Sequence, residues 1–230
     1  MLIEGFPLWI AQTNCFIVAP DGPGGDCVII DAPPDPTAIL QRLHHHELRP
    51  VALFSTHGHV DHIGGVGTIV HSHEHGHEID VRINRHDRAM LTDIEAYAGP
   101  FRSYLEGLDL RPPEVIGELD DGDEVRGAGM TFTCLHTPGH TKGSVCLTLE
   151  VDGEAPILFS GDHLFAGSIG RTDLPGGSFD DLMISMAAKI LPLSDETNVL
   201  PGHGPLTTIG RERATNPFIA ELLADKGRWS

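Results

Sequence analysis

The sequence contains no uninterrupted apolar run of the ~20 residues that a membrane-spanning helix needs. Its first residues also lack the basic stretch and the apolar core of a secretory signal peptide. We therefore expect a cytoplasmic protein with no membrane partner. Basic residues are scarce as well, because 15 Lys and Arg stand against 33 Asp and Glu, which gives a net charge of -18. Since binding to phosphate backbones depends on Lys and Arg, this balance argues against a nucleic-acid partner.

Cysteines are few and never form a Cys-x-x-Cys pair. The four residues Cys15, Cys27, Cys134 and Cys146 lie in apolar, strand-like segments. Without a secretory signal, buried and reduced thiols are the expected state. No stretch rich in proline, serine or charge divides the chain, so we expect residues 1–230 to form one domain.

Segments with strand and helix patterns alternate along the chain. In the first half we expect strands at 15–19, 27–31, 51–54 and 79–83, with helices at 36–47 and 61–75. The second half begins with several strands between 115 and 160 and continues with a helix capped by Ser178, a strand at 198–200 and a helix at 216–225. Because each half has strands followed by helices, we expect an α/β protein with two packed sheets and helices outside, an αββα four-layer sandwich.

Four metal-binding side chains follow the strand that ends at Ser55. The segment reads Thr-His-Gly-His-Val-Asp-His, which places His57, His59, Asp61 and His62 within six residues. In an extended segment residues i and i+2 project to the same side, so His57 and His59 can bind one ion together. Asp61 and His62 lie where the chain turns into a helix and can face a neighbouring ion. This spacing predicts a metal site.

Three further donors each follow a predicted strand at a sharp turn with glycine or proline. They are His140 after Thr-Pro-Gly, Asp162 after Ser-Gly, and His203 after Pro-Gly. Each of two zinc-like ions needs about four donors and an open position for water. Together with the four residues above, the chain supplies seven donors on strand-end loops. We therefore expect a centre with two divalent ions, zinc first, with iron or manganese as alternatives.

The order of these motifs resembles the metallo-β-lactamase superfamily. Within it, the contexts Thr-Pro-Gly-His-Thr-Lys-Gly-Ser, Ser-Gly-Asp-His-Leu-Phe and Leu-Pro-Gly-His-Gly are similar to short, single-domain glyoxalase II-like hydrolases, that is, hydroxyacylglutathione hydrolase-like proteins. The resemblance implies the metallo-β-lactamase fold and a shared ligand set. One ion would be held by His57, His59 and His140, the other by Asp61, His62 and His203, and Asp162 would bridge both. Asp162 stands where zinc β-lactamases characteristically have cysteine, which argues against β-lactam hydrolysis.

The expected reaction is hydrolysis of a small-molecule thioester, from S-acyl thiol and water to acid and thiol. Water shared by two cations is acidified toward neutrality, and the resulting metal-bound hydroxide attacks the substrate carbonyl. A thiol with a pKa near ~8.5 leaves as thiolate without a dedicated acid. Asp61 is the expected catalytic residue, as a ligand that also holds the hydroxide in place.

The residues that bind glutathione in the long glyoxalase II enzymes are matched less well in this sequence than the metal ligands are. Long glyoxalase II enzymes use a Lys and a Tyr after the bridging Asp, and this chain has Arg171 and Asp173 at those places. Arg171 is the expected substrate-binding residue, because its guanidinium can bind a carboxylate. Only residues 204–230 follow His203, too few for the additional helical domain of the long enzymes. Another small thiol carrier therefore remains an alternative to glutathione.

Three other functions fit parts of the sequence. A mono-iron persulfide dioxygenase of the same superfamily shares the H-x-H-x-D-H motif and Gly-Arg-Thr-Asp at 170–173. A lactone or other ester hydrolase would use the same ions. A metal-buffering protein would rely instead on the histidine-rich tracts 44–46 and 71–77. We expect both tracts to lie at helix C-termini away from the metal loop, where imidazoles interact favourably with the helix dipole.

Overall fold

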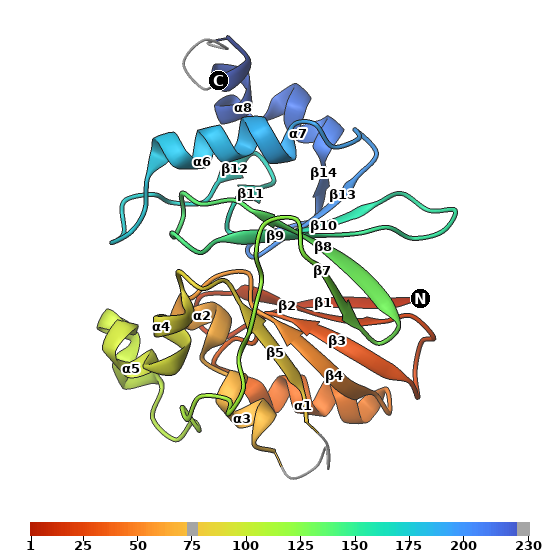
Figure 1. The fold of residues 1–230 in the computed structure, drawn as a ribbon, viewed down its shortest axis with the longest axis vertical. Coiled ribbons are helices and arrows are strands. Elements are labelled where there is room, and N and C mark those ends of the chain that lie inside the picture. Colours follow the sequence, from red (N-terminus) through yellow and green to blue (C-terminus); the bar gives the residue numbers. More distant parts are fainter. Residues whose placement is uncertain (73–77, 225–230) are drawn as a thin grey trace. The chain divides into compact units, whose positions relative to one another are not determined.

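The computed structural model describes residues 1–72 and 78–224 and contains two compact units (Figure 1). The first unit comprises Met1–Glu118 with Arg126–Met130, and the second comprises Leu119–Val125 with Thr131–Ser230. Each unit has its own sheet and its own hydrophobic core. The expectation that 1–230 forms a single domain stays a prediction.

The first unit is built on a six-stranded sheet in the order β1-β2-β3-β4-β5-β6. The hairpin β1–β2 and the pair β2–β3 are antiparallel, whereas β3, β4, β5 and β6 run parallel to one another. Its elements are β1 (Leu2–Leu8), β2 (Thr13–Ala19), β3 (Asp26–Ile30), α1 (Pro36–His45), β4 (Arg49–Phe54), α2 (Val60–Ile63), α3 (Val66–Val70), β5 (Asp80–Ile83), α4 (Arg88–Thr92), α5 (Ile94–Tyr97), the 3-10 helix η1 (Gly99–Tyr104) and β6 (Gly117–Glu118).

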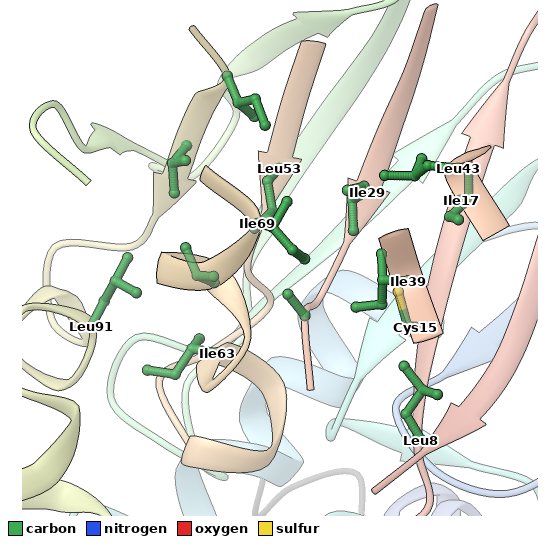
Figure 2. Packing of buried hydrophobic residues seen from close by; sticks show 14 of the residues in the cluster. Leu8, Cys15, Ile17, Ile29, Ile39, Leu43, Leu53, Ile63, Ile69 and Leu91 are labelled. Atoms are coloured by element: carbon green, nitrogen blue, oxygen red, sulfur yellow. The ribbon is translucent and has the colours of Figure 1, made fainter. Parts of the chain in front are cut away.

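The core of the first unit lies between the sheet and helices α1 and α3. Figure 2 shows Ile39 and Leu43 of α1 and Ile69 of α3 packed with strand residues such as Ile29 and Leu53, all of them buried. In α1 the buried positions recur at helical spacing, and alternate residues of the strands face the same cluster, as the 3.6-residue and 2-residue periods require. These periodicities are the signals that predict the elements from the sequence.

The helix expected at 61–75 is wrong in its extent. The structure has two short helices instead, α2 and α3, separated by Gly64 and Gly65. A Cβ atom at position 65 would lie 2.3 Å from the carbonyl oxygen of Pro33. The glycine pair therefore allows the backbone that follows α2 to approach the 32–34 loop. Helix α3 ends at Val70, with His71 as its C-cap.

The second sheet has six strands in the order β14-β13-β10-β9-β8-β7, and it belongs to the second unit except for the ends of β7 and β8 within Arg126–Met130. Strands β10 and β13 are parallel, and the pairs β13–β14, β9–β10 and β8–β9 are antiparallel. A two-stranded sheet of β11 and β12 follows β10 along the chain and precedes helix α6. The elements are β7 (Glu124–Gly127), β8 (Met130–His136), β9 (Val145–Leu149), β10 (Ile157–Gly161), β11 (Leu164–Phe165), β12 (Ser168–Ile169), α6 (Phe179–Ser185), the π-helix η2 (Met186–Ile190), β13 (Asn198–Pro201), β14 (Thr207–Thr208), α7 (Ile209–Thr215) and α8 (Pro217–Ala224).

Helices α6, η2, α7 and α8 supply one side of the second core. The predicted N-cap is confirmed, because the Ser178 hydroxyl accepts a hydrogen bond from the backbone N–H of Asp181. Leu182, Met186 and Ile190 are fully buried, as their i, i+4, i+8 spacing predicts. Helix α7 was not predicted, since it begins directly after the two-residue strand β14. None of the helices in the part of the chain that the structure describes is long and apolar enough to cross a bilayer.

Candidate metal centre

The sheet of the first unit brings polar side chains to one edge. Strands β3, β4 and β5 are parallel, so the residues that follow them meet at the same end of the sheet. Asp31 follows β3, the His57 loop follows β4, and Asp87 lies shortly after β5. Thr13 joins them because β2 runs antiparallel to β3 and therefore begins at this edge.

The four predicted donors of the first unit cluster on the loop between β4 and α2. The ring of His57 lies 4.8 Å from that of His59 and 4.0 Å from that of His62, measured between centroids. The Nε2 atom of His62 is 3.6 Å from Oδ2 of Asp61, and Thr13 donates a hydrogen bond of 2.9 Å to the same carboxylate oxygen. Gly58 keeps this loop compact, because its N–H donates to Asp87 and a Cβ there would lie 2.6 Å from Sδ of Met90.

Asp31 fixes the orientation of two of these histidines. Its carboxylate accepts hydrogen bonds from the Thr56 N–H (2.7 Å), the Thr56 hydroxyl (2.8 Å) and Nδ1 of His62 (2.8 Å). Because a carboxylate only accepts, Nδ1 of His62 carries the proton and Nε2 carries the lone pair. Because the Thr56 hydroxyl donates its proton to Asp31, its oxygen accepts a hydrogen bond from Nδ1 of His57 at 3.1 Å. Both rings are thus held in the tautomer that a metal ligand through Nε2 needs.

We expect Asp31→Asn to weaken metal binding about 10- to 100-fold, the usual effect of losing a carboxylate that orients ligating histidines. Asn preserves the volume and tolerates the left-handed backbone of residue 31, whose φ is +59°. The Asn side chain, however, has an NH₂ group that cannot accept a hydrogen bond, whereas the Asp31 carboxylate accepts from two donors of Thr56 and one of His62. Metal affinity is measured by competition with a chromophoric chelator.

Asp26→Asn is the matched control for that variant, because Asp26 forms an ion pair with exposed Arg49 at the far end of the same strand. Its metal affinity should equal that of the unmodified protein. An Asp31→Asn protein with unchanged affinity would show that this carboxylate does not orient the site.

The second unit collects its three predicted donors in the same way. Strands β8 and β10 both run antiparallel to β9, and β13 runs parallel to β10, so β8, β10 and β13 all end at one edge. His140, Asp162 and His203 lie in the turns that follow these three strands. The Gly202 N–H donates to the carbonyl of Gly161, which ties the Asp162 and His203 turns together at 2.8 Å.

Asp162 lies between the two imidazoles. Its Oδ2 atom is 3.5 Å from Nε2 of His140 and 3.5 Å from Nε2 of His203. These separations are longer than a charge-assisted hydrogen bond. They match the distance of about 3.4 Å between two ligand atoms of a tetrahedral ion with bonds of about 2.1 Å. The side chains therefore fit a metal ion, and a carboxylate shared by two imidazoles has the position of a bridging ligand.

The backbone of residues 170–171 holds His140. Nδ1 of His140 donates to the main-chain carbonyl of Arg171 at 2.7 Å, which places the lone pair on Nε2. Gly170 permits this contact, because a Cβ there would lie 1.7 Å from the carbonyl oxygen of Asp162 and 3.3 Å from Nδ1 of His140. On the other side, the Gly139 carbonyl accepts from the N–H of Ser178 at the start of α6.

The Arg171 side chain makes a bidentate ion pair with Asp173, at 2.8 and 2.7 Å. Both side chains are exposed, and the pairing lowers the pKa of Asp173 to about 2. Asp173, which stands where the long glyoxalase II enzymes have Tyr, thus already binds the guanidinium of Arg171. A substrate-binding role for the Arg171 side chain stays a prediction.

The buried cysteine thiols and the buried imidazole of His163 are uncharged at neutral pH. All four cysteines are buried and unbridged, as predicted, and burial raises the pKa of Cys146 to about 12. A thiol with such a pKa is neither a nucleophile nor a ligand at neutral pH. Burial, with a further contribution from His140, lowers the pKa of His163 to about 3. His163 is therefore a buried, neutral histidine.

The described residues of the histidine-rich tracts, His44–His46 and His71, are not members of the donor clusters. Residues 73–77 lie outside the described residues, so the placement expected for that tract stays a prediction. His71, which precedes them, caps α3 and lies 3.4 Å from a carboxylate oxygen of Asp109. The tract at 44–46 ends α1 as expected, and His46 contacts Glu4 at 2.8 Å.

A cavity of about 790 Å³ opens in the first unit along residues 93–111. Both arginines on its wall are paired with carboxylates of the same wall, Arg102 with Glu95 and Arg111 with Asp109. None of the predicted ligands lines it. The cavity therefore does not mark the metal centre, whose position follows from the donor clusters.

Three supporting residues were missed in the sequence: Asp31, Thr13 and Asp87. Each is a single polar residue at a strand end, with no motif around it. Strand pairing is the signal that would have found Asp31, because a parallel β3–β4 pair places the residue after Ile30 beside the residues after Phe54. The sequence predicts both strands but does not specify that they are neighbours.

A family model described as the metallo-beta-lactamase superfamily matches residues 9–203. The chain therefore belongs to the metallo-β-lactamase superfamily, as the resemblance predicts. This membership, with the solved structures below, confirms the expected fold class, the α/β four-layer sandwich of that superfamily. It also supports a metal-dependent hydrolase as the class of protein.

Three relatives illustrate the range of this similarity. Hydroxyacylglutathione hydrolase GloC of Haemophilus influenzae is 34% identical over 95% of this chain and 98% of its own length. The structure of BLEG-1, a B3 metallo-β-lactamase, has a TM-score of 0.81 at 38% identity and covers 95% of this chain and 99% of that one. TTHA1623 in a di-iron-bound form has a TM-score of 0.75 at 34% identity, with 94% and 99% coverage.

Proposed function

We propose that the protein is a dinuclear metal hydrolase that cleaves the thioester of a small thiol, as in glyoxalase II-like hydrolases. His57, His59 and His140 would hold one ion, Asp61, His62 and His203 the other, and Asp162 both. The similarity to GloC supports the thioester, and the di-iron form of TTHA1623 supports a two-metal centre in which iron is an alternative to zinc.

The single observation that carries the proposal is the position of Asp162 between His140 and His203 at ligand-to-ligand distances of 3.5 Å. A carboxylate with two oxygens and about four lone-pair sites can serve two cations, which a histidine cannot. When bound, such a pair of ions acidifies water and polarises the carbonyl that the water attacks.

The chain's own residues position the reacting groups. Thr13 holds Oδ2 of Asp61, which limits the rotation of this carboxylate and leaves it in place to orient the attacking water. Asp31, Thr56 and the Arg171 carbonyl keep the lone pairs of three histidines on Nε2. A thiolate with a pKa near ~8.5 departs without a proton, so no further acid is required.

The substrate would be a small molecule with little negative charge. The chain's net charge of -18 repels anions, and the guanidinium of Arg171 is already paired with Asp173. A neutral or weakly charged thiol carrier therefore fits better than one recognised through two carboxylates. A cytoplasmic location and the absence of nucleic-acid and membrane partners remain part of this proposal.

The proposal is tested with purified protein of known metal content. We expect two metal ions per chain by elemental analysis, and hydrolysis of S-lactoyl thioesters of glutathione and of the neutral thiol N-acetylcysteamine. Release of thiol is followed with a chromogenic disulfide. Lactones, a β-lactam and glutathione persulfide with an oxygen electrode complete the panel, and the β-lactam is included because BLEG-1 is a B3 metallo-β-lactamase.

Each alternative gives a different result in this panel. One iron per chain with oxygen uptake would identify a persulfide dioxygenase, and turnover of lactones without thioesters would identify an ester hydrolase. Metal binding by the histidine-rich tracts alone would leave the protein inactive throughout the panel. Any of these three results would overturn the proposal.

A further inference from the structure

An exposed aromatic cluster lies beside the predicted ligands of the first unit. Trp9, from the turn between β1 and β2, contacts two residues of η1: its ring lies 5.3 Å from Phe101 and 6.2 Å from Tyr104. Phe101 and Tyr104 are 6.5 Å apart. Tilted and edge-on rings at these distances attract one another and leave aromatic faces open. We call these three residues the aromatic cluster.

Two of the three rings of the aromatic cluster are exposed, whereas Trp9 is half-buried and packs against the core of the first unit. Tyr104 is 55% exposed and Phe101 is 37% exposed, and their neighbours Ile10 and Tyr97 are 54% and 53% exposed. None of the residues of η1 is buried. A contiguous apolar surface of this kind marks a site for a ligand or a partner.

The unusual backbone conformation of Trp9 also indicates a ligand-binding role for this turn. Its φ is +60°, in the left-handed region that a bulky residue rarely adopts, and Gln12 at the other end of the turn has a φ of +55°. The Gln12 side chain donates to the carbonyl of Trp9 at 2.9 Å and holds this conformation. Strained residues that are fixed in this way cluster at ligand-binding sites.

Two connections tie the aromatic cluster to the metal loop. Leu8 and Thr13 are paired across the β1–β2 hairpin, and Trp9 directly follows Leu8. The Thr13 hydroxyl donates a hydrogen bond to Asp61 of the metal loop. On the other side, η1 follows α4 and α5, and Met90 of α4 packs against Gly58 between His57 and His59. The aromatic cluster therefore borders the loop that carries four of the seven donors.

The charges around the aromatic cluster disfavour an anionic group in contact with its rings. Arg102 is the only Lys or Arg between residues 93 and 106, and it is paired with Glu95. Asp93, Glu95 and Glu106 add negative charge to the same segment. An uncharged aromatic group, in contrast, loses little on leaving water and gains stacking with three rings.

We propose that the aromatic cluster of Trp9, Phe101 and Tyr104 binds the acyl group of the substrate and makes the enzyme selective for uncharged aromatic acyl thioesters. This inference rests on the thioester hydrolysis proposed above and names its substrate class. The carbonyl carbon of the thioester must reach the metals, and it carries the acyl group on one side and the thiol on the other. We assign the aromatic cluster to the acyl group, and the mandelate experiment below, which contains no thiol, separates the two.

The first test compares two substrates that differ in one group. S-mandeloyl and S-lactoyl N-acetylcysteamine share the thiol, the carbonyl and the α-hydroxyl, and differ by a phenyl ring in place of a methyl group. We expect the mandeloyl thioester to have the higher kcat/KM, by about tenfold or more. Phe101→Ala and Tyr104→Ala should each lower the mandeloyl-to-lactoyl ratio about tenfold, through KM of the mandeloyl substrate.

Ile184→Ala is the matched control, because Ile184 is an apolar residue of α6 with a similar exposure of 47% and belongs to the second unit. Its substrate ratio should stay within about twofold of the unmodified protein. An equal loss of the ratio in Ile184→Ala, or an unmodified protein that hydrolyses both thioesters equally well, would overturn the inference.

A second test does not depend on turnover. The sequence has two tryptophans, and in a Trp229→Phe background the fluorescence reports on Trp9 alone. We expect mandelate, the acid product, to change this fluorescence at concentrations at which lactate does not, and Phe101→Ala to weaken the response about tenfold. If neither thioester is hydrolysed but mandelate still acts on Trp9, the proposed function fails and the aromatic site stands. If both are hydrolysed and Trp9 does not respond, the site fails and the function stands.

Discussion

Asp162→Asn should abolish hydrolysis, with kcat reduced about 10³-fold or more. The substitution keeps the volume but removes the negative charge and one oxygen donor between His140 and His203. Stabilisation of charge by a metal centre contributes several kcal/mol to the barrier, and its loss corresponds to a reduction of this size. The metal content, measured by elemental analysis, should fall from two ions per chain to one or fewer.

Asp173→Asn is the control for this result. Asp173 is an exposed carboxylate eleven residues further along the chain, and its described partner is Arg171. Both variants should keep the unfolding temperature of the unmodified metal-free protein within a few degrees, which separates loss of chemistry from loss of fold. An Asp162→Asn protein that retains two ions and normal kcat would contradict the bridging role.

Gly170→Ala should be nearly as damaging, although residue 170 is not itself a predicted ligand. The added Cβ would lie 1.7 Å from the carbonyl oxygen of Asp162, a distance that no contact permits, so the backbone of one of the two segments must move. Either movement displaces Asp162 or the Arg171 carbonyl that holds His140. A misplacement of about 1 Å at a catalytic site costs about 10²-fold in rate, and overpacking costs about 1–3 kcal/mol of stability.

Steady-state kinetics and thermal unfolding measure these two effects of Gly170→Ala. Gly25→Ala is a suitable control, because a Cβ at position 25 meets its nearest neighbours at an ordinary 3.7 Å. That variant should retain both rate and stability. Full activity of Gly170→Ala would mean that the 162 turn shifts without consequence for the ligands.

The candidate donors can be recognised in the sequence more readily than the residues that support them. Ligand-type side chains stand beside glycine and proline in short motifs, so His57, His140, Asp162 and His203 can be recognised locally. The supports depend on which strands are neighbours, and nothing in the sequence near Asp31 or Thr13 states that β3 lies beside β4 or that β2 begins at the same edge. The Arg171 contact is harder still, since a main-chain carbonyl has no sequence signature.

The boundaries of helices and strands likewise divide into those that local sequence predicts and those that depend on tertiary contacts. The expected strands and the capped helix α6 follow from periodicity and from the Ser178 cap, and the structure contains them. Strand β1 and the two-residue strands β11, β12 and β14 are not predicted. The long helix expected at 61–75 is wrong, because a hydrophobic pattern continues through Gly64 and Gly65 while the backbone there must pass close to Pro33. Close approach of two backbone segments is a tertiary constraint that periodicity does not contain.

The contact between His140 and a peptide carbonyl has an evolutionary consequence. Every amino acid supplies that carbonyl, so mutation can explore different side chains at position 171 while the imidazole stays anchored. Its neighbour at position 170 has no such freedom, because any residue larger than glycine collides with the Asp162 turn. The two adjacent positions should therefore differ sharply in their tolerance of substitution, since position 171 can change its side chain without loss of the carbonyl that holds His140, whereas position 170 cannot.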